Sequence, residues 1–261
     1  MITAASSRAY GPITNTTVGL GTTRALVGGE GVCHWKMLLY GMHLGHPWHT
    51  VEFVVIPPGA SCGEHTHGET EEVYYLLSGR ATMYLDGTPL EVSAGDLITT
   101  PIGSRHAIAN HAGQDMQLFV VEVFPGAGAG GQPTHIALQQ NIQEFPSLRG
   151  ADCPIRAATV DLGALLTGSW RAFTVAAIPP GGTLGPYRCH EGVEVVFVVQ
   201  GETSMLVGDE RVSGATGLCV AVPTGLVRSI TNTSSDQPLT VVWIEVAFSA
   251  QHPSREAHMI S

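Results

Sequence analysis

The chain has 261 residues, of which 44% are hydrophobic, and a formal net charge of −10. Nucleic acids and anionic membranes are bound by basic surfaces, and the sequence contains no cluster of Lys or Arg, so neither is an expected partner. No apolar run approaches the roughly 18 residues of a spanning helix. The first residues also lack the basic start and apolar run of a secretory signal, so we expect a cytoplasmic protein.

Residues 1–47 form an N-terminal extension that the pattern does not place. Short segments rich in β-branched and aromatic residues follow, separated by Gly, Pro, Asp and Ser, as expected for β-strands and tight turns. The first set of predicted strands is Thr50–Ile56, Glu72–Leu77, Ala81–Leu85, Leu97–Thr100, His106–Asn110 and Met116–Val123. We assign these strands to a first β-barrel over residues 48–125.

A glycine-rich stretch, Gly126–Gly131, then opens a predicted linker over residues 126–169. Short helices are expected within it, at Thr134–Phe145 and Leu162–Leu166. A second barrel is predicted over residues 170–261. Its expected strands are Ala172–Ile178, Val193–Val199, Thr203–Val207, Leu218–Val222, Val227–Thr231 and Leu239–Val246.

The two sets of strands are one pattern repeated at a distance of 122 residues, as from Trp48 to Trp170. The matching residues, which stand mostly at turns, include Pro57 with Pro179, Gly59 with Gly181, Glu72 with Glu194, Gly79 with Gly201, Gly95 with Gly217, Pro101 with Pro223, Gly103 with Gly225, and Asn110 with Asn232. Because this period is the length of a small β-domain, the sequence indicates a tandem duplication rather than a solenoid. The expected fold class is all-β, with two antiparallel barrels joined by short helices.

Three histidines and one glutamate form a candidate metal site in the first copy. His65 and His67 alternate, so on a strand their side chains share a face. A turn at residues 68–70 would bring Glu72 beside them on the next strand, and His106 is the candidate fourth ligand from a later strand. Imidazole and carboxylate ligands suit first-row divalent metals.

These residues resemble the two motifs of the cupin family. The first motif, G(X)5HXH(X)3–4E(X)6G, is matched by Gly59, His65, His67, Glu72 and Gly79; the second, G(X)5PXG(X)2H(X)3N, is matched by Gly95, Pro101, Gly103, His106 and Asn110. The resemblance implies a bicupin, two tandem jelly-roll barrels, with one divalent metal per chain. Iron is favoured over manganese, nickel, zinc or copper, and family members often form homodimers.

The second copy departs from the metal motif. In the same register Glu194 keeps its place, while Tyr187, Cys189 and Arg228 replace the three histidines. We therefore expect no metal there and a salt bridge between Arg228 and Glu194. The alternatives are a one-residue slip that brings in Arg188 and His190, or a pocket in which Arg188 or Arg228 binds an anionic substrate.

Two neighbours of Glu72 receive opposite interpretations. Alternation turns Glu71 away from Glu72, so it is expected to be an exposed acid. Tyr74 shares the face of Glu72, where its phenol could orient a substrate or donate a proton, and it is the candidate catalytic residue.

The expected function is that of a metal-dependent enzyme acting on a small molecule. We place a dioxygenase or another oxygenase first, since the ligand set suits iron and O2. An isomerase, cyclase, lyase or decarboxylase is the alternative, and a bicupin that binds a small ligand without turnover is the second alternative. The family resemblance does not select among them.

Overall fold

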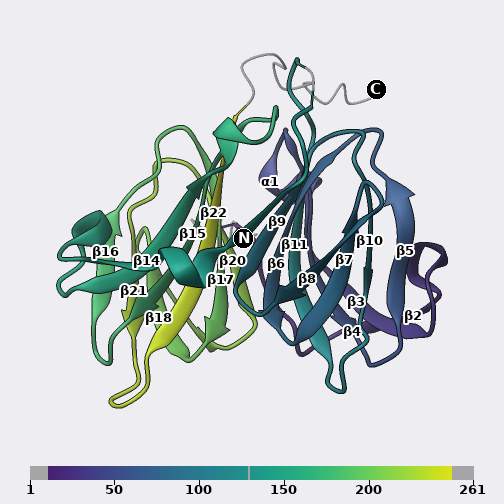
Figure 1. Ribbon diagram of the computed structural model, residues 1–261. Helices are drawn as coiled ribbons and strands as arrows, with labels where there is room; N and C mark the ends of the chain where they lie inside the picture. The colour runs from purple at the N-terminus through teal and green to yellow at the C-terminus, as the bar shows by residue number, and fades with distance from the viewer. Residues whose placement is uncertain (1–10, 129, 249–261) are drawn as a thin grey trace, which may run out of the picture.

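The structure is a computed structural model that describes residues 11–128 and 130–248. Two β-barrels lie side by side, the first drawn in purple to teal and the second in green to yellow (Figure 1). Each barrel consists of a seven-stranded and a four-stranded sheet with antiparallel pairing. The predicted fold class, two tandem all-β barrels, is confirmed.

The large sheet of the first barrel has the order β12-β9-β6-β11-β4-β3-β2 and its small sheet the order β5-β10-β7-β8. The bounds of the strands of this barrel are β2 Gly21–Arg24, β3 Val32–Tyr40, β4 Trp48–Ile56, β5 Ser61–Thr66, β6 Glu71–Ser78, β7 Arg80–Leu85, β8 Thr88–Ser93, β9 Asp96–Thr100, β10 Arg105–Ala109, β11 Met116–Val123 and β12 Thr134–Ala137.

The second barrel repeats this arrangement, with large-sheet order β1-β20-β17-β22-β15-β14-β13 and small-sheet order β16-β21-β18-β19. The bounds of its strands are β1 Ile13–Asn15, β13 Gln143–Phe145, β14 Ile155–Asp161, β15 Trp170–Ile178, β16 Thr183–Tyr187, β17 Gly192–Gln200, β18 Glu202–Val207, β19 Glu210–Ala215, β20 Leu218–Val222, β21 Arg228–Asn232 and β22 Leu239–Ala247. All twelve strands predicted from the repeat are present within two residues of their expected ends.

The barrels exchange edge strands. Strand β1 precedes the first barrel in sequence but pairs with β20 of the second, while β12 follows the first barrel and pairs with its β9. These positions correspond between the two sheets, so each barrel completes its large sheet with a segment from outside its own repeat.

The segments around the repeats therefore contain more strand than the sequence pattern indicated. The expected helix over residues 134–145 is instead β12, a 3-10 turn η2 (Leu138–Asn141) and β13. The expected helix over residues 162–166 is only the 3-10 turn η4 (Leu162–Ala164). The N-terminal extension supplies β1, β2 and β3. β1 pairs with β20, which is distant in sequence, whereas β2 pairs with β3 and β3 pairs with β4.

The large sheets pack face to face and bury a shared apolar core between the barrels. Across this interface the rings of Phe119 and Phe197 lie 4.9 Å apart, and those of Tyr75 and Phe173 lie 5.2 Å apart. Each barrel also has a core of its own inside. Both faces of strands β11 and β17 are thus covered, which explains their nearly continuous apolar sequences.

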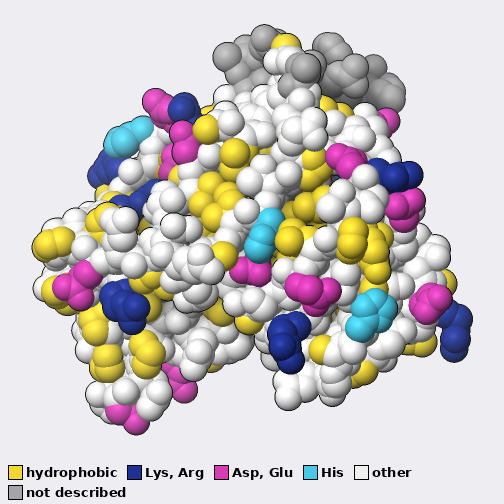
Figure 2. Space-filling view, in the orientation of Figure 1, with side chains coloured by type: hydrophobic (Ala, Val, Ile, Leu, Met, Phe, Trp, Pro, Cys, Tyr) yellow, Lys and Arg dark blue, Asp and Glu magenta, His cyan; other side chains and the backbone are white. Residues whose placement is uncertain are grey.

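In residues 11–128 and 130–248, helical structure is confined to short pieces. Besides η2 and η4 it comprises α1 (Gly41–Leu44), η1 (Leu26–Gly28) and η3 (Leu148–Gly150). Among the described residues, no helix is long and apolar enough to cross a membrane. Lys and Arg side chains are scattered over the face drawn in Figure 2 and form no basic patch there.

Candidate metal centre

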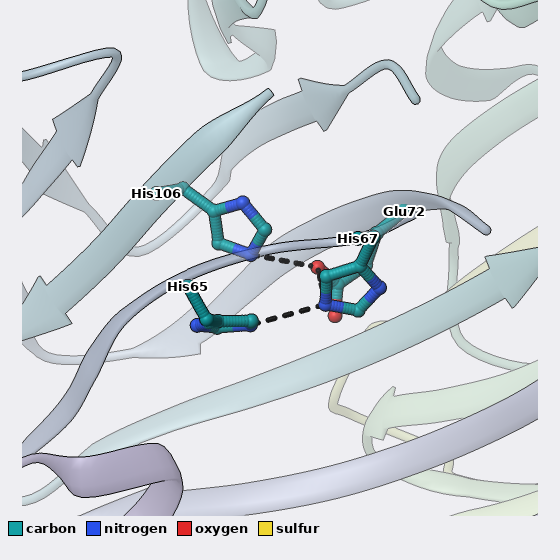
Figure 3. A group of neighbouring side chains, drawn as sticks. All are labelled: His65, His67, Glu72 and His106. Atoms are coloured by element: carbon teal, nitrogen blue, oxygen red, sulfur yellow. Dashed lines mark hydrogen bonds and ion pairs between the residues drawn. The ribbon is translucent and has the colours of Figure 1, made fainter. Parts of the chain in front are cut away.

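Inside the first barrel, three strands bring together the four residues expected to bind metal. Strand β5 carries His65 and is followed directly by His67, β10 carries His106, and β6 of the facing sheet carries Glu72. One ligand atom from each lies within 4.8 Å of all the others (Figure 3). Within residues 11–128 and 130–248, this is the one group of three or more such side chains that converges in this way.

The nitrogen and oxygen atoms of these residues face one another at short distances. His65 Nε2 lies 3.0 Å from His67 Nε2, and Glu72 Oε2 lies 3.1 Å from His106 Nε2. Glu72 Oε2 is buried and, despite its short distance to His106 Nε2, accepts no hydrogen bond of acceptable geometry. Burial lowers the pKa of His65 and of His106, which favours the neutral imidazoles that metals bind.

Hydrogen bonds on the far side of two rings fix which nitrogen is free. His65 Nδ1 lies 2.8 Å from Gly63 O, which can only accept, so the proton is on Nδ1. The Thr70 hydroxyl donates to Glu122 Oε2 at 3.0 Å and accepts from His67 Nδ1 at 2.7 Å. Both rings then present the lone pair of Nε2 to the cluster, as metal-binding histidines do. The residues present therefore fit a divalent cation.

A cavity of about 280 Å³ adjoins the cluster. Its wall is mainly apolar, with three carboxyl groups, those of Glu52, Glu72 and Glu122, and the indole of Trp35. Leu26 and Val27 of η1 also line it. Burial raises the pKa of Glu72 to about 7, partly opposed by His67. The cavity can hold a small molecule beside the four ligand atoms.

Tyr74 lies where the alternation of β6 predicted it. Its hydroxyl is 2.9 Å from His106 Nε2, and its side chain lines the cavity. Burial raises the pKa of Tyr74 well above its usual value, so the phenol keeps its proton at neutral pH. A role in catalysis remains a proposal.

The interpretation of Glu71 as an exposed acid is wrong. Its side chain does point away from Glu72, but this face of β6 packs on the second barrel, and Glu71 is fully buried. Its carboxylate accepts hydrogen bonds from the backbone of Thr167 and Gly168, from the Thr167 hydroxyl and from Trp170 Nε1, at 2.7 to 2.9 Å. Glu71 thus joins the barrels directly beside the candidate metal ligand Glu72.

The corresponding site of the second barrel is filled by ion pairs. Arg228, fully buried, donates from Nε to Glu194 Oε1 at 2.9 Å, in agreement with the expected salt bridge. Arg149 donates to Glu194 Oε2 at 2.7 Å, and the Tyr187 hydroxyl also donates to Glu194 at 2.7 Å. The carboxylate that would bind metal is therefore fully engaged.

The alternatives for the second barrel are not supported by the arrangement. Arg188 and His190 are exposed at the surface. Cys189 donates to Glu245 Oε1 at 3.1 Å. The sequence pattern missed Arg149, because it lies outside the repeat and reaches the cluster from η3.

Four residues that support or line the first-barrel site were not among the predicted site residues. Glu122 and Thr70 support His67, and the exposed His49 donates to Glu122 at 2.9 Å. Glu52 lines the cavity from β4. Alternation along β4 could have identified Glu52, since it shares the inward face with Val54 and Ile56.

Fold and site together define a two-barrel β-protein with a candidate mononuclear metal centre in one barrel. The chain belongs to the cupin family: the model of the cupin domain matches residues 52–122 and again residues 174–245.

Curated relatives match only part of the chain. An oxalate-binding protein of Thermotoga maritima is 35% identical over 66 residues, which are 25% of this chain and 54% of that protein. An uncharacterised protein of Methanocaldococcus jannaschii is 41% identical over 56 residues, 22% of this chain and 45% of its own. The chain thus spans about half the length of the curated relatives it matches.

Solved structures match across both barrels. A putative glyoxylate-induced protein of Pseudomonas aeruginosa superposes with a TM-score of 0.71 at 14% identity, covering 89% of this chain and 86% of that one. A variant of oxalate decarboxylase from Bacillus subtilis gives 0.69 at 15% identity, covering 93% and 78%. At this identity the likeness shows the two-barrel fold alone.

Proposed function

We propose that the first barrel binds one divalent metal ion through His65, His67, Glu72 and His106, and that the chain is a metal-dependent enzyme acting on a small molecule. The carrying observation is the convergence of these four ligand atoms, with two imidazoles held so that Nε2 faces the cluster. Four protein ligands leave one or two positions open on a five- or six-coordinate ion, as catalytic sites do.

When bound, the ion would act as a Lewis acid that polarises a substrate oxygen and offers open coordination positions. The chain supplies the surroundings. Apolar side chains of the cavity exclude bulk water, and the neutral phenol of Tyr74 is placed to donate a hydrogen bond to a molecule in the cavity. The supports of His65 and His67 fix the direction of both rings.

The first candidate activity is oxygenation, with iron as the metal, because three imidazoles and one carboxylate suit iron in a site that also admits O2 and substrate. The substrate, the metal and the reaction are proposals, as are a cytoplasmic location and a homodimer.

The second candidate is decarboxylation of a small acid. It is favoured by the relative from Thermotoga maritima that is named for binding oxalate, and by the presence of a further carboxyl group, Glu52, in the cavity. The same relative supports the non-catalytic alternative, a protein that binds such an acid without turnover.

The deciding experiment is elemental analysis of protein purified without chelator, followed by assays of O2 consumption and of CO2 release from oxalate. One equivalent of metal per chain with either activity supports the proposal. One equivalent without turnover of any small acid or other candidate substrate favours the binding protein. Absence of metal even after reconstitution overturns the metal site.

A further inference from the structure

One carboxyl group of the cavity belongs neither to the metal cluster nor to its supports. Glu52 lies on the inward face of β4 and opposes Val120 on β11, which in turn opposes Tyr74 on β6. Adjacent strands are about 4.8 Å apart, so the Cα atoms of Glu52 and Tyr74 are separated by about 10 Å. Glu52 and Tyr74 therefore point into the cavity from the same sheet, two strands apart, at a separation that a small substrate spans.

The indole of Trp35 orients this carboxyl group. Trp35 on β3 donates from Nε1 to Glu52 Oε2 at 2.6 Å, and both side chains line the cavity. Among the residues that the structure describes, no Lys, Arg or His forms an ion pair with Glu52. Burial of a carboxyl group among Val54, Ile56 and Val120, with no cation to pair with it, lowers the stability of the fold. A purely structural role therefore does not account for Glu52.

The other titratable groups that line the cavity include two carboxyl groups and two imidazoles. They are Glu122 of β11, Glu72 and Tyr74 of β6, Cys62 and His65 of β5, and His67 directly after β5. Burial is the largest cause that raises the pKa of Glu52, to about 7; the hydrogen bond from Trp35 opposes the rise, and Glu122 and Glu72 add to it. Near neutral pH the group can thus hold a proton or release it, as a general acid or base must.

We propose that Glu52 is the proton-exchanging group of this cavity, and that it contacts the substrate from β4, two strands away from β6 with Glu72 and Tyr74. The inference rests on the proposed metal-dependent function and adds a second reacting group to it. The proton passes from the Glu52 carboxyl oxygen to an atom of the substrate, and the carboxylate regains a proton from water. In the reverse direction the carboxylate takes a proton from the substrate and later releases it to water.

A direct consequence is proton uptake when an anion enters the cavity. With the metal bound, a small monoanion such as formate should bind beside a neutral Glu52, since an ionised one would repel it. At a pH where Glu52 is ionised in the metal-loaded wild type, each formate bound should therefore be accompanied by uptake of a fraction of a proton. Calorimetric titration in two buffers of different ionisation enthalpy measures this uptake.

Two variants separate proton exchange from a structural role. Glu52→Gln keeps an oxygen for the Trp35 hydrogen bond but cannot exchange a proton, so its metal content and circular dichroism should equal those of the wild type while the uptake disappears. Turnover of any substrate found should fall by about 10²-fold or more. In Trp35→Phe the uptake should remain and shift to higher pH, because the lost hydrogen bond had lowered the pKa of Glu52.

The outcomes distinguish this inference from the proposed function. A wild type without metal overturns the proposed function. If the wild type holds metal and takes up protons on binding formate, and Glu52→Gln still shows this proton uptake, only the role of Glu52 is overturned. Formate binding without uptake, or no formate binding by the metal-loaded wild type, also overturns the role of Glu52 and leaves the metal site standing.

Discussion

In the candidate metal site, a single hydrogen bond to Nδ1 orients each of two candidate ligands, His65 and His67. Gly63 O and the Thr70 hydroxyl engage the Nδ1 atoms of His65 and His67, so both rings are oriented before an ion arrives. Glu122 holds the Thr70 hydroxyl in place. Such supports raise metal affinity because they fix tautomer and direction together.

Removal of one ligand tests the four-residue assignment. Loss of a group that only supports a ligand typically lowers metal affinity by roughly 10–100-fold. His106→Ala should lower it further, because it removes a buried ligand itself. Metal content per chain after dialysis measures this. The matched variant Arg228→Met, at the corresponding position of the second barrel, should keep the full content. Equal metal retention by His106→Ala would refute the assignment.

Glu52 should also make the free energy of unfolding depend on pH. Folding raises its pKa from 4.5 to about 7, so between these values the folded state keeps a proton that the unfolded state has lost. The wild type therefore loses stability as the pH rises through this window. The side chain of Glu52→Gln does not titrate. With metal removed from both proteins, the free energy of unfolding of the variant should therefore rise relative to that of the wild type as the pH goes from about 4.5 to 7. Urea unfolding with chelator present measures the difference, and a gap that is constant with pH would contradict the raised pKa.

At the scale of elements, β6 serves two sites with its two faces. Glu72 and Tyr74 point into the first barrel, while Glu71 and Tyr75 point to the interface with the second. The strand can do this because both faces of the large sheet are covered. A change at the interface is therefore one residue away from a candidate metal ligand.

Replacement of Glu71 should separate interface stability from the metal site. Glu71→Gln places an amide N–H₂ among groups that all donate hydrogen bonds, and we expect a loss of roughly 2–4 kcal/mol in the free energy of unfolding. The metal content should stay at the wild-type level. Glu91→Gln, an exposed carboxyl group on β8, is the control and should change stability by less than about 0.5 kcal/mol. Similar stability of the two variants would contradict the anchoring role of Glu71.

Elements with a strong local pattern could be predicted, and elements that depend on a distant partner could not. The apolar strands of the repeat and the four candidate ligands follow from alternation and spacing. Strand β1 was missed because it pairs with β20, far along the chain, and β12 was missed because its four residues lie in a segment expected to be helical. Glu71 was misassigned since alternation gives the side of a strand but not what covers that side. Arg149 reaches its partner from outside the repeat.

At the scale of the whole molecule, each half is incomplete alone. If the barrels separate, Phe119 and Phe197 of the shared core become exposed. Each large sheet also contains an edge strand from outside its own repeat. Apolar surface of this extent and unpaired strand edges both promote aggregation.

Expression of the halves tests this interdependence. Residues 1–125 and 126–261 produced separately should each aggregate, and co-expression should yield one complex of the size of the intact chain. Size-exclusion chromatography distinguishes the results. A stable monomeric first half with a full metal content would show that the barrels fold independently.

The exchange of edge strands also sets an order of events during synthesis. Strand β1 leaves the ribosome early, but the edge of β20 that it joins is made about 200 residues later. At 5–20 residues per second this is a wait on the order of ten to forty seconds. The first barrel, in contrast, can close its large sheet as soon as β12 follows it. The nascent chain should thus assemble the candidate metal site before the segment at its own beginning has found its place.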